Sequence, residues 1–470
     1  MLSSLKSALN HYRENASQHI DYLKDFTRIP SVSFPGFPPE EVERSAIFVQ
    51  ELMDKAGLEN TQILKLEGTH PYVYGEWIHQ PDAPTVLLYA HHDVQPPLRE
   101  SVWKTPPFEP TQVGDRLFAR GIADDKAGVM IHIASIEAYL KTSGHLPVNV
   151  KVIVEGEEEI GSEHLAQFLE KYGSLLKADT MVLTDCTNYD TGIPSLTTSL
   201  RGLVSMDITV SAMDHPLHSG MWGGPIPDPA MGLSKMLSGL VDAKGRIALD
   251  DLWKEVTPPT PEEVEAYRSL NMDATLFRKQ SGLHPTTHLF SDQEQLLLQI
   301  WREPSLVINS IEVGGKKIAG NVLMDSAWAR IGLRLVPDMD PQKCATILKD
   351  YLKEHCPWGL ELTIEEEAGV AAWKTTPTHP IFKVAADSLS KGYGKPTVFI
   401  GCGGTIPFVA PLSDKLGITP ALLVGIEDPY TNAHSENESL CLSDFHKAAN
   451  SQIYFFNDLA EYFKNKSDEN

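Results

Sequence analysis

The stretch Thr85–Asp93, TVLLYAHHD, decides the fold. Its apolar residues match a buried strand of a parallel sheet, and three polar residues follow that strand at once. Open α/β sheets build their sites at the carboxyl ends of their strands. His91 and Asp93 are two residues apart, so on an extended chain both point to the same side. A carboxylate there can hold one imidazole nitrogen and leave the other free for a metal ion.

Length and composition limit the class of protein. With 470 residues, 42% of them hydrophobic and 22% charged, the chain is typical of a globular protein of two or three domains. A net charge of −23 argues against nucleic acid or an anionic membrane as partner. No apolar stretch approaches the roughly 20 residues of a membrane helix, and the first residues lack the apolar core of a signal peptide. Five scattered cysteines indicate reduced thiols in a cytoplasmic protein.

Hydrophobic periodicity predicts an α/β fold in the first part of the chain. Helical stripes are expected before residue 28, from Glu41 to Gly57 and from Val129 to Gly144. Apolar strands are expected at Val148–Glu155 and Asp179–Asp185. Strands and helices in alternation indicate a mixed, largely parallel sheet sandwiched by helices.

Near Arg201 the pattern changes to half-exposed strands with clean alternation, as in Val204–Val210 and Ala327–Leu335. This pattern predicts a separate antiparallel α+β domain, carrying a polar and largely helical insertion at 245–300. Buried strands return at Pro396–Ile400 and Pro420–Ile426. The predicted organisation is therefore one α/β domain, 1–200 and 366–470, interrupted by an inserted domain at 201–365.

Five polar clusters follow apolar strands or begin helices. Taken alone, most of them are explained by an ordinary structural role. Two adjacent histidines are usually surface or core residues, and paired aspartates before a helix usually cap it. The run EGEEEIGS is different, because so many glutamates after a buried strand are costly without a cation. The clusters are His91–Asp93, Gly121–Gly128 (GIADDKAG), Glu155–Ser162 (EGEEEIGS), Asp185 and Asn432–Glu438 (NAHSENE).

Taken together, the clusters predict a metal site along one edge of the sheet. Two histidines with several carboxylates suit zinc, manganese or cobalt. The surplus of carboxylates indicates two ions that share one ligand, about 3.5–4 Å apart.

These motifs resemble the M20 family of co-catalytic metallopeptidases, which includes carnosine dipeptidases, carboxypeptidase G and acyl-amino-acid deacylases. The resemblance rests on LLYAHHDVQP, RGIADDKAG, EGEEEIGS, LTD, HSG and NAHSENE, which follow the family order along nearly the whole chain. It implies two divalent ions per chain, with zinc expected and manganese or cobalt as alternatives. It also implies that the inserted domain is a lid and the surface of a homodimer.

The resemblance assigns roles residue by residue. It implies that His91, Asp124 and Asp185 bind one ion and that Asp124, Glu159 and His434 bind the other. It makes Asp93 the carboxylate that orients His91, and Glu158 the general base. It further implies that His218, from this chain or from a partner protomer, stabilises the oxyanion, and that a substrate carboxylate is held by Arg334, Gly403, Gly404 and Thr405.

Two departures from the family pattern bear on the substrate. Gly401-Cys402 stands where the carnosine-dipeptidase branch often has an Arg-Glu pair, and Ala127 replaces a glycine. We expect a peptidase that cleaves dipeptides or short peptides with a free C-terminal carboxylate. The alternatives are an N-acyl-amino-acid amidohydrolase with the same metals and a metal-binding scaffold without activity. The spacing AHHDVQ does not fit the HxHxDH motif of metallo-β-lactamase-like hydrolases.

Overall fold

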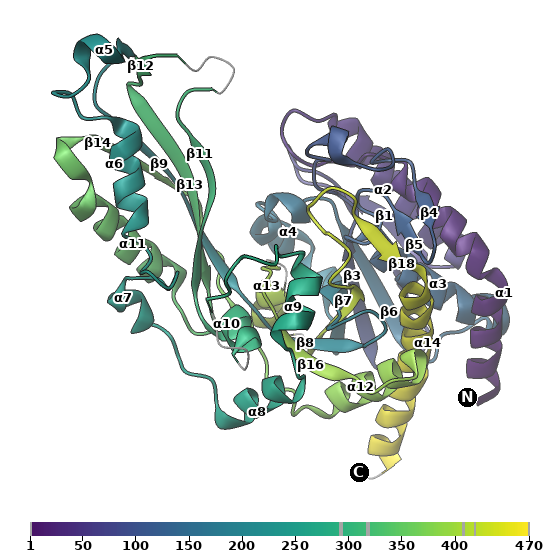
Figure 1. The fold of residues 1–470 in the computed structure, drawn as a ribbon. Coiled ribbons are helices and arrows are strands. Elements are labelled where there is room, and N and C mark those ends of the chain that lie inside the picture. Colours follow the sequence, from purple (N-terminus) through teal and green to yellow (C-terminus); the bar gives the residue numbers. More distant parts are fainter. Residues whose placement is uncertain (1, 291–294, 316–319, 407–408, 418–419, 469–470) are drawn as a thin grey trace. The chain divides into compact units, whose positions relative to one another are not determined.

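The decisive stretch forms β3 (Thr85–His91), a central strand of a mixed sheet (Figure 1). The computed structural model describes residues 2–290, 295–315, 320–406, 409–417 and 420–468. Contacts divide the chain into two compact units, Met1–Thr198 with Thr376–Ile400 and Ile406–Asn470, and Ser199–Thr375 with Gly401–Thr405. We call them the first and the second unit.

The first unit contains a sheet in the order β1-β2-β6-β3-β7-β17-β8, with β16 beside β8. The four strands β6, β3, β7 and β17 run parallel, and the outer pairs are antiparallel. This confirms the predicted mixed, largely parallel sheet, whose parallel strands lie at its centre. The strands are β1 (Glu59–Leu64), β2 (Tyr72–Trp77), β6 (Asn149–Glu155), β7 (Thr180–Thr187), β8 (Ser195–Leu200), β16 (Val398–Cys402) and β17 (Ala421–Glu427). A smaller sheet has the order β18-β5-β4, from Ser439–Cys441, Arg116–Phe118 and Thr111–Val113.

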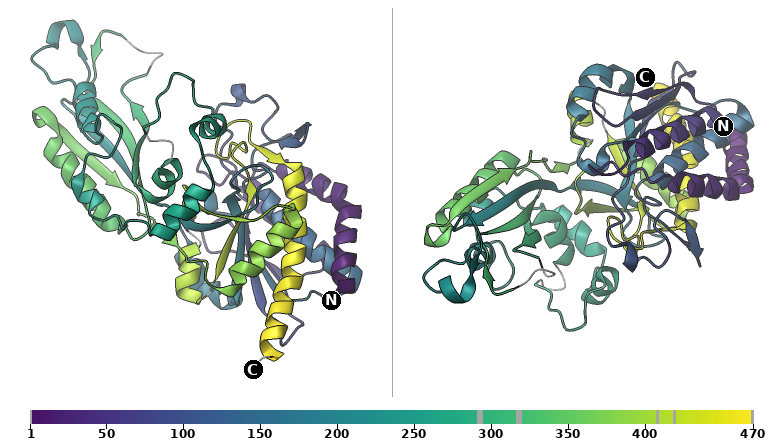
Figure 2. Two further views of the ribbon diagram at one scale, coloured as in Figure 1. Left: turned by 60° about the horizontal axis from the view of Figure 1, so that its bottom comes forward. Right: turned by 90° about the horizontal axis from the view of Figure 1, so that it is seen from above.

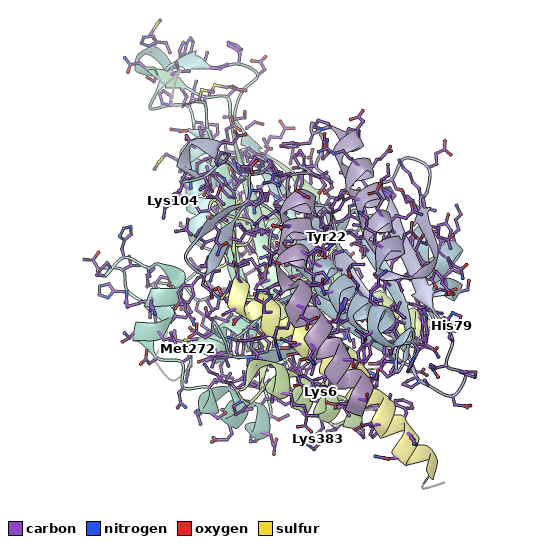
Figure 3. The ribbon with its side chains drawn as sticks, turned by 90° about the vertical axis from the view of Figure 1, so that its right-hand side faces the viewer. Lys6, Tyr22, His79, Lys104, Met272 and Lys383 are labelled. Atoms are coloured by element: carbon purple, nitrogen blue, oxygen red, sulfur yellow. The ribbon has the colours of Figure 1, made fainter. Side chains whose placement is uncertain are left out.

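The helices of the first unit pack on one another and on the sheet. α1 (Leu2–Thr27) contacts α3 (Lys126–Ser143) and α14 (Leu442–Asp468), and α14 contacts α12 (Pro380–Tyr393) (Figure 2). Figure 3 shows α1, with Lys6 and Tyr22 labelled on it, crossing α14. The other helices are α2 (Pro39–Ala56), α4 (Leu165–Tyr172) and α13 (Val409–Leu416). Buried apolar residues from these helices and from the sheet form one continuous core.

Two predicted helix ends are confirmed by their glycine caps. Gly57 after α2 has φ 99°, and Gly144 after α3 has φ 70°, so both lie in the left-handed region where glycine costs least. α3 begins directly after Asp124-Asp125, but Asp125 makes no side-chain capping bond to the helix. The aspartate pair therefore does not have the ordinary capping role.

The second unit is built on an antiparallel sheet in the order β11-β13-β9-β14, as the alternating pattern predicts. The strands are β9 (Gly202–Ser211), β11 (Ser305–Glu312), β13 (Ser326–Leu335) and β14 (Glu361–Glu366). α6 (Pro229–Ser238) and α11 (Pro341–His355) bury one face in a second hydrophobic core. Asp340 caps α11 by accepting a hydrogen bond from Lys343 N at 2.9 Å.

The predicted polar insertion is largely helical within its described part. It contains α7 (Asp250–Trp253), α8 (Pro261–Ser269), α9 (Ala274–Ser281) and α10 (Leu296–Arg302). The remaining short elements are α5 (Ser219–Trp222), the pair β10 (Leu217–His218) and β12 (Val322–Leu323), and β15 (Trp373–Lys374), which pairs with Ser199 and Leu200. Among the described helices, none is both long and apolar enough to cross a membrane.

Candidate metal centre

Parallel pairing brings the predicted residues of the first unit to one edge of the sheet. His91 ends β3 opposite Glu155, the last residue of β6, and the turn after β6 carries Glu158 and Glu159. Asp185 lies near the end of β7. The carboxyl ends of parallel strands meet at one edge, so side chains distant in sequence come together there.

Asp124 lies between the two histidines. Its Oδ1 is 3.0 Å from His91 Nε2, and its Oδ2 is 3.0 Å from His434 Nε2. His91 Nε2 is also 3.8 Å from Asp185 Oδ1, and His434 Nε2 is 3.2 Å from Glu159 Oε2. The two groups expected around the ions, with Asp124 common to both, therefore lie together in the structure.

The spacing of these donor atoms fits metal ions. Two ligands at about 2.1 Å from a tetrahedral zinc ion stand about 3.4 Å apart. The observed separations of 3.0 to 3.8 Å lie around that value. Imidazole nitrogens and carboxylate oxygens are also the donors that zinc, manganese and cobalt accept.

The shifted pKa values of the cluster also indicate a site for cations. Burial raises the pKa of Glu159 to about 7, with a further contribution from Asp124, and burial and Asp185 raise the pKa of Glu158 well above its ordinary value. Burial alone would lower the pKa of His434, yet hydrogen bonds to Asp124 and Glu159 raise it to about 12. So much negative charge in a buried place requires compensation, which divalent cations supply.

Asp93 makes hydrogen bonds that position other residues of the cluster. It is fully buried, and its carboxylate accepts hydrogen bonds from Ser33 Oγ at 2.7 Å, Glu158 N at 3.2 Å and Glu159 N at 3.0 Å. His91 Nδ1 lies 3.0 Å from the Asp93 backbone oxygen and 3.5 Å from its Oδ1. Asp93 therefore orients His91 mainly through its carbonyl, while its carboxylate fixes the Glu158–Glu159 turn.

Sequence reasoning assigned no role to Glu438, which ties together the two loops that carry Asp124 and His434. Its buried carboxylate accepts hydrogen bonds from Gly121 N at 2.8 Å, Ala123 N at 3.0 Å and Asp124 N at 3.2 Å. Arg120 donates to it at 2.7 Å and, through Nη2, to Ser435 O at 2.9 Å. The sequence feature that could have identified Glu438 is its position at the end of the motif NAHSENE.

Glu427 is a second acid without a predicted role. It ends β17, and its carboxylate, Asp124 and Asp185 each offer an oxygen within 4.8 Å of the others. Burial raises its pKa well above the ordinary value, and the charges of Asp124 and Asp185 add to the effect. Its position directly after the apolar run Pro420–Ile426 was the signal that could have identified it.

The residues expected to bind the substrate belong to the second unit. Arg334 on β13 donates from Nη1 to Thr405 Oγ1 at 2.9 Å, and Thr405 Oγ1 donates to Arg201 O at 2.6 Å. Arg201 N donates to Gly404 O at 3.0 Å. Hydrogen bonds therefore connect Arg334 and Thr405 to Arg201 and Gly404.

His218 lies elsewhere in the second unit. It ends the short strand β10, it is exposed, and its Nδ1 accepts a hydrogen bond from Gly220 N at 3.1 Å. This bond occupies Nδ1, so Nε2 is the ring nitrogen that a ligand would meet.

A cluster of two histidines, His91 buried and His434 exposed, and several carboxylates at a sheet edge defines the centre of a dinuclear metallohydrolase. The model of Peptidase family M20/M25/M40 matches residues 87–457, and the chain belongs to this family. The predicted enzyme class, a metallopeptidase, is thereby confirmed.

Relatives and solved structures agree over nearly the whole chain. The Cys-Gly metallodipeptidase DUG1 of Candida albicans is 30% identical over 94% of this chain and 94% of its own length. The structure of the di-peptidase Dug1p from Saccharomyces cerevisiae matches with a TM-score of 0.89 and 27% identity, over 98% of this chain and 99% of that one. Human carnosine dipeptidase 1 matches with a TM-score of 0.88 and 25% identity, over 97% and 99%.

Proposed function

We propose that this M20 peptidase is a dipeptidase that hydrolyses dipeptides or short peptides with a free C-terminal carboxylate. The observation that carries the proposal is the cluster in which Asp124 contacts both His91 and His434. Relatives that are named as dipeptidases and covered over nearly their whole length support it.

The proposed ligands are His91, Asp124 and Asp185 for one ion and Asp124, Glu159 and His434 for the other. When bound, two such ions acidify a water molecule and polarise the scissile carbonyl. We take zinc as the expected metal, with manganese and cobalt as the alternatives, because these ligands accept all three.

Glu158 is the proposed general base. Burial and neighbouring carboxylates raise its pKa, so it holds a proton readily. It accepts the proton of the attacking water as the carbon–oxygen bond forms. It then delivers this proton to the amine nitrogen as the carbon–nitrogen bond breaks, which yields two amino acids from a dipeptide.

The second unit supplies the proposed substrate contacts. Arg334 can present a planar guanidinium to the terminal carboxylate, and Gly403, Gly404 and Thr405 can add backbone and hydroxyl donors. His218 is the proposed donor to the developing oxyanion. We also propose that the inserted domain, expected at 201–365, acts as lid and homodimer surface, and that 1–200 and 366–470 form the catalytic domain.

An N-acyl-amino-acid amidohydrolase remains the second candidate, favoured by one observation. Gly401-Cys402 stands where an Arg-Glu pair is common in the dipeptidase branch, so a charged contact near the carboxylate is missing. A cytoplasmic location is part of the proposal, supported by five cysteines that form no disulfide among the described residues.

Metal-restored hydrolysis tests the proposal. The protein is stripped with chelator, and Zn²⁺, Mn²⁺ or Co²⁺ is added before assays on dipeptides and N-acetyl amino acids. Cleavage of free dipeptides restored by about two ions per chain is the expected result. Cleavage of the acyl compounds alone would transfer the protein to the deacylases. If two ions bind and no substrate is cleaved, the result would favour the alternative of a metal-binding scaffold without activity.

A further inference from the structure

We propose that Glu427 binds the free α-ammonium group of the substrate and so selects unblocked peptides over N-acyl amino acids. The inference rests on the proposed peptidase function and names the group on the substrate that this site recognises. No role was assigned to Glu427 by sequence reasoning, although it lies in the same cluster as Asp124 and Asp185.

The position of Glu427 follows from strand pairing. β17 runs parallel to β7, with Glu427 paired to Thr187, two residues beyond Asp185. Thr187 Oγ1 donates to Glu427 Oε2 at 2.9 Å, and among the described residues it is the only hydrogen-bond donor to this carboxylate. The second oxygen is therefore available, on a side chain that is held in place and 9% exposed.

The cluster holds more carboxylates than two divalent ions neutralise. The carboxylates that approach one another there are Asp124, Glu158, Glu159, Asp185 and Glu427. Two divalent ions bring four positive charges against these five acids. Since an uncompensated buried charge is costly, a further cation is favoured, and an ammonium group supplies it.

The geometry of a dipeptide places its ammonium group at this point. The α-nitrogen is only two bonds from the scissile carbonyl carbon. A residue that recognises it must therefore lie beside the ions that act on the carbonyl. Glu427, with an oxygen within 4.8 Å of oxygens of Asp124 and Asp185, meets this requirement. An N-acyl amino acid has no charge at that position and gains nothing from the carboxylate.

The test compares alanyl-alanine with propionyl-alanine, which differ only by the ammonium group. In the wild-type enzyme with its metals, we expect kcat/KM to favour alanyl-alanine. Glu427→Gln should lower kcat/KM for alanyl-alanine about 10- to 100-fold, the effect of losing one charged hydrogen bond, and leave propionyl-alanine nearly unchanged. Asp190→Asn, an acid-to-amide change on the loop after β7, is the matched control and should alter neither substrate.

Binding without turnover gives a second measurement. In a Glu158→Ala background, calorimetry should show that Glu427→Gln weakens binding of alanyl-alanine and not of propionyl-alanine. Thr187→Val, which frees the Glu427 carboxylate, should cause a smaller loss in the same direction. This variant keeps the test informative if Glu427→Gln folds poorly.

Three outcomes would overturn the assignment. An equal loss on both substrates together with a lost ion would make Glu427 a metal ligand. If Glu427→Gln keeps two ions and the same preference for alanyl-alanine, another residue binds the ammonium group. The dipeptidase proposal would then still stand. A wild-type enzyme that prefers propionyl-alanine would refute the dipeptidase proposal and this inference together.

Discussion

At the scale of single residues, the proposed chemistry depends on Glu158, and the proposed ligands should hold the ions without it. Glu158→Ala should keep about two ions per chain and lower kcat about 10²- to 10⁴-fold, the usual contribution of a general base. Metal analysis beside steady-state kinetics checks this. Retained activity would refute the general-base assignment, and lost ions would make Glu158 a ligand.

Arg334 is the second residue whose role can be isolated. If it holds the terminal carboxylate, Arg334→Ala should raise KM for free dipeptides about 10- to 100-fold and much less for their C-terminal amides. The matched control is Arg330→Ala on the same strand, whose guanidinium is paired with Asp207 and Glu367. Equal effects of Arg334→Ala on acids and amides would exclude the carboxylate clamp.

At the scale of elements, the centre depends on how two loops are joined. Glu438 connects the loop before α3 to the loop that carries His434, through the backbone of residues 121–124. Glu438→Gln breaks a buried charged pair with Arg120 and should lower the free energy of unfolding by about 3 kcal/mol. It should also weaken the binding of the ion that we propose Asp124 and His434 share.

Chelator competition and thermal unfolding measure the two effects. Glu436→Gln is the matched control in the same loop, because Glu436 pairs with Arg99 and makes no hydrogen bond to residues 121–124 among the described contacts. If both variants bind metal like the wild type, the loops are held by other contacts.

At the scale of the whole molecule, the ions and the fold stabilise each other. The carboxylates at the sheet edge repel one another when no cation is present, and only the folded chain gathers them. Removing the ions with chelator should therefore lower the melting temperature, and an excess of about 100 times the Kd should restore about 2.7 kcal/mol per site. Calorimetry with and without Zn²⁺ checks this. An unchanged melting temperature would mean that the cluster binds no ion in the native protein.

The sequence by itself determined the local elements and the location of the site. Apolar runs of strand length, the glycine caps after α2 and α3 and the alternating strands of the second unit are local patterns, and the structure confirms them. The cluster at the carboxyl ends of β3, β6 and β7 was predictable for the same reason, because parallel strands end at one edge. The family motifs added an expectation of which residues share an ion.

Only the tertiary structure decided the roles that depend on contacts between distant segments. Glu438 is one acid among many in the sequence, and its hydrogen bonds to residues 121–124 exist only because the two loops meet. Glu427 likewise joins Asp124 and Asp185 through the pairing of β17 with β7, a register that no local pattern specifies. Burial turns these acids from solvated charges into groups that require a partner, and burial is a property of the folded chain.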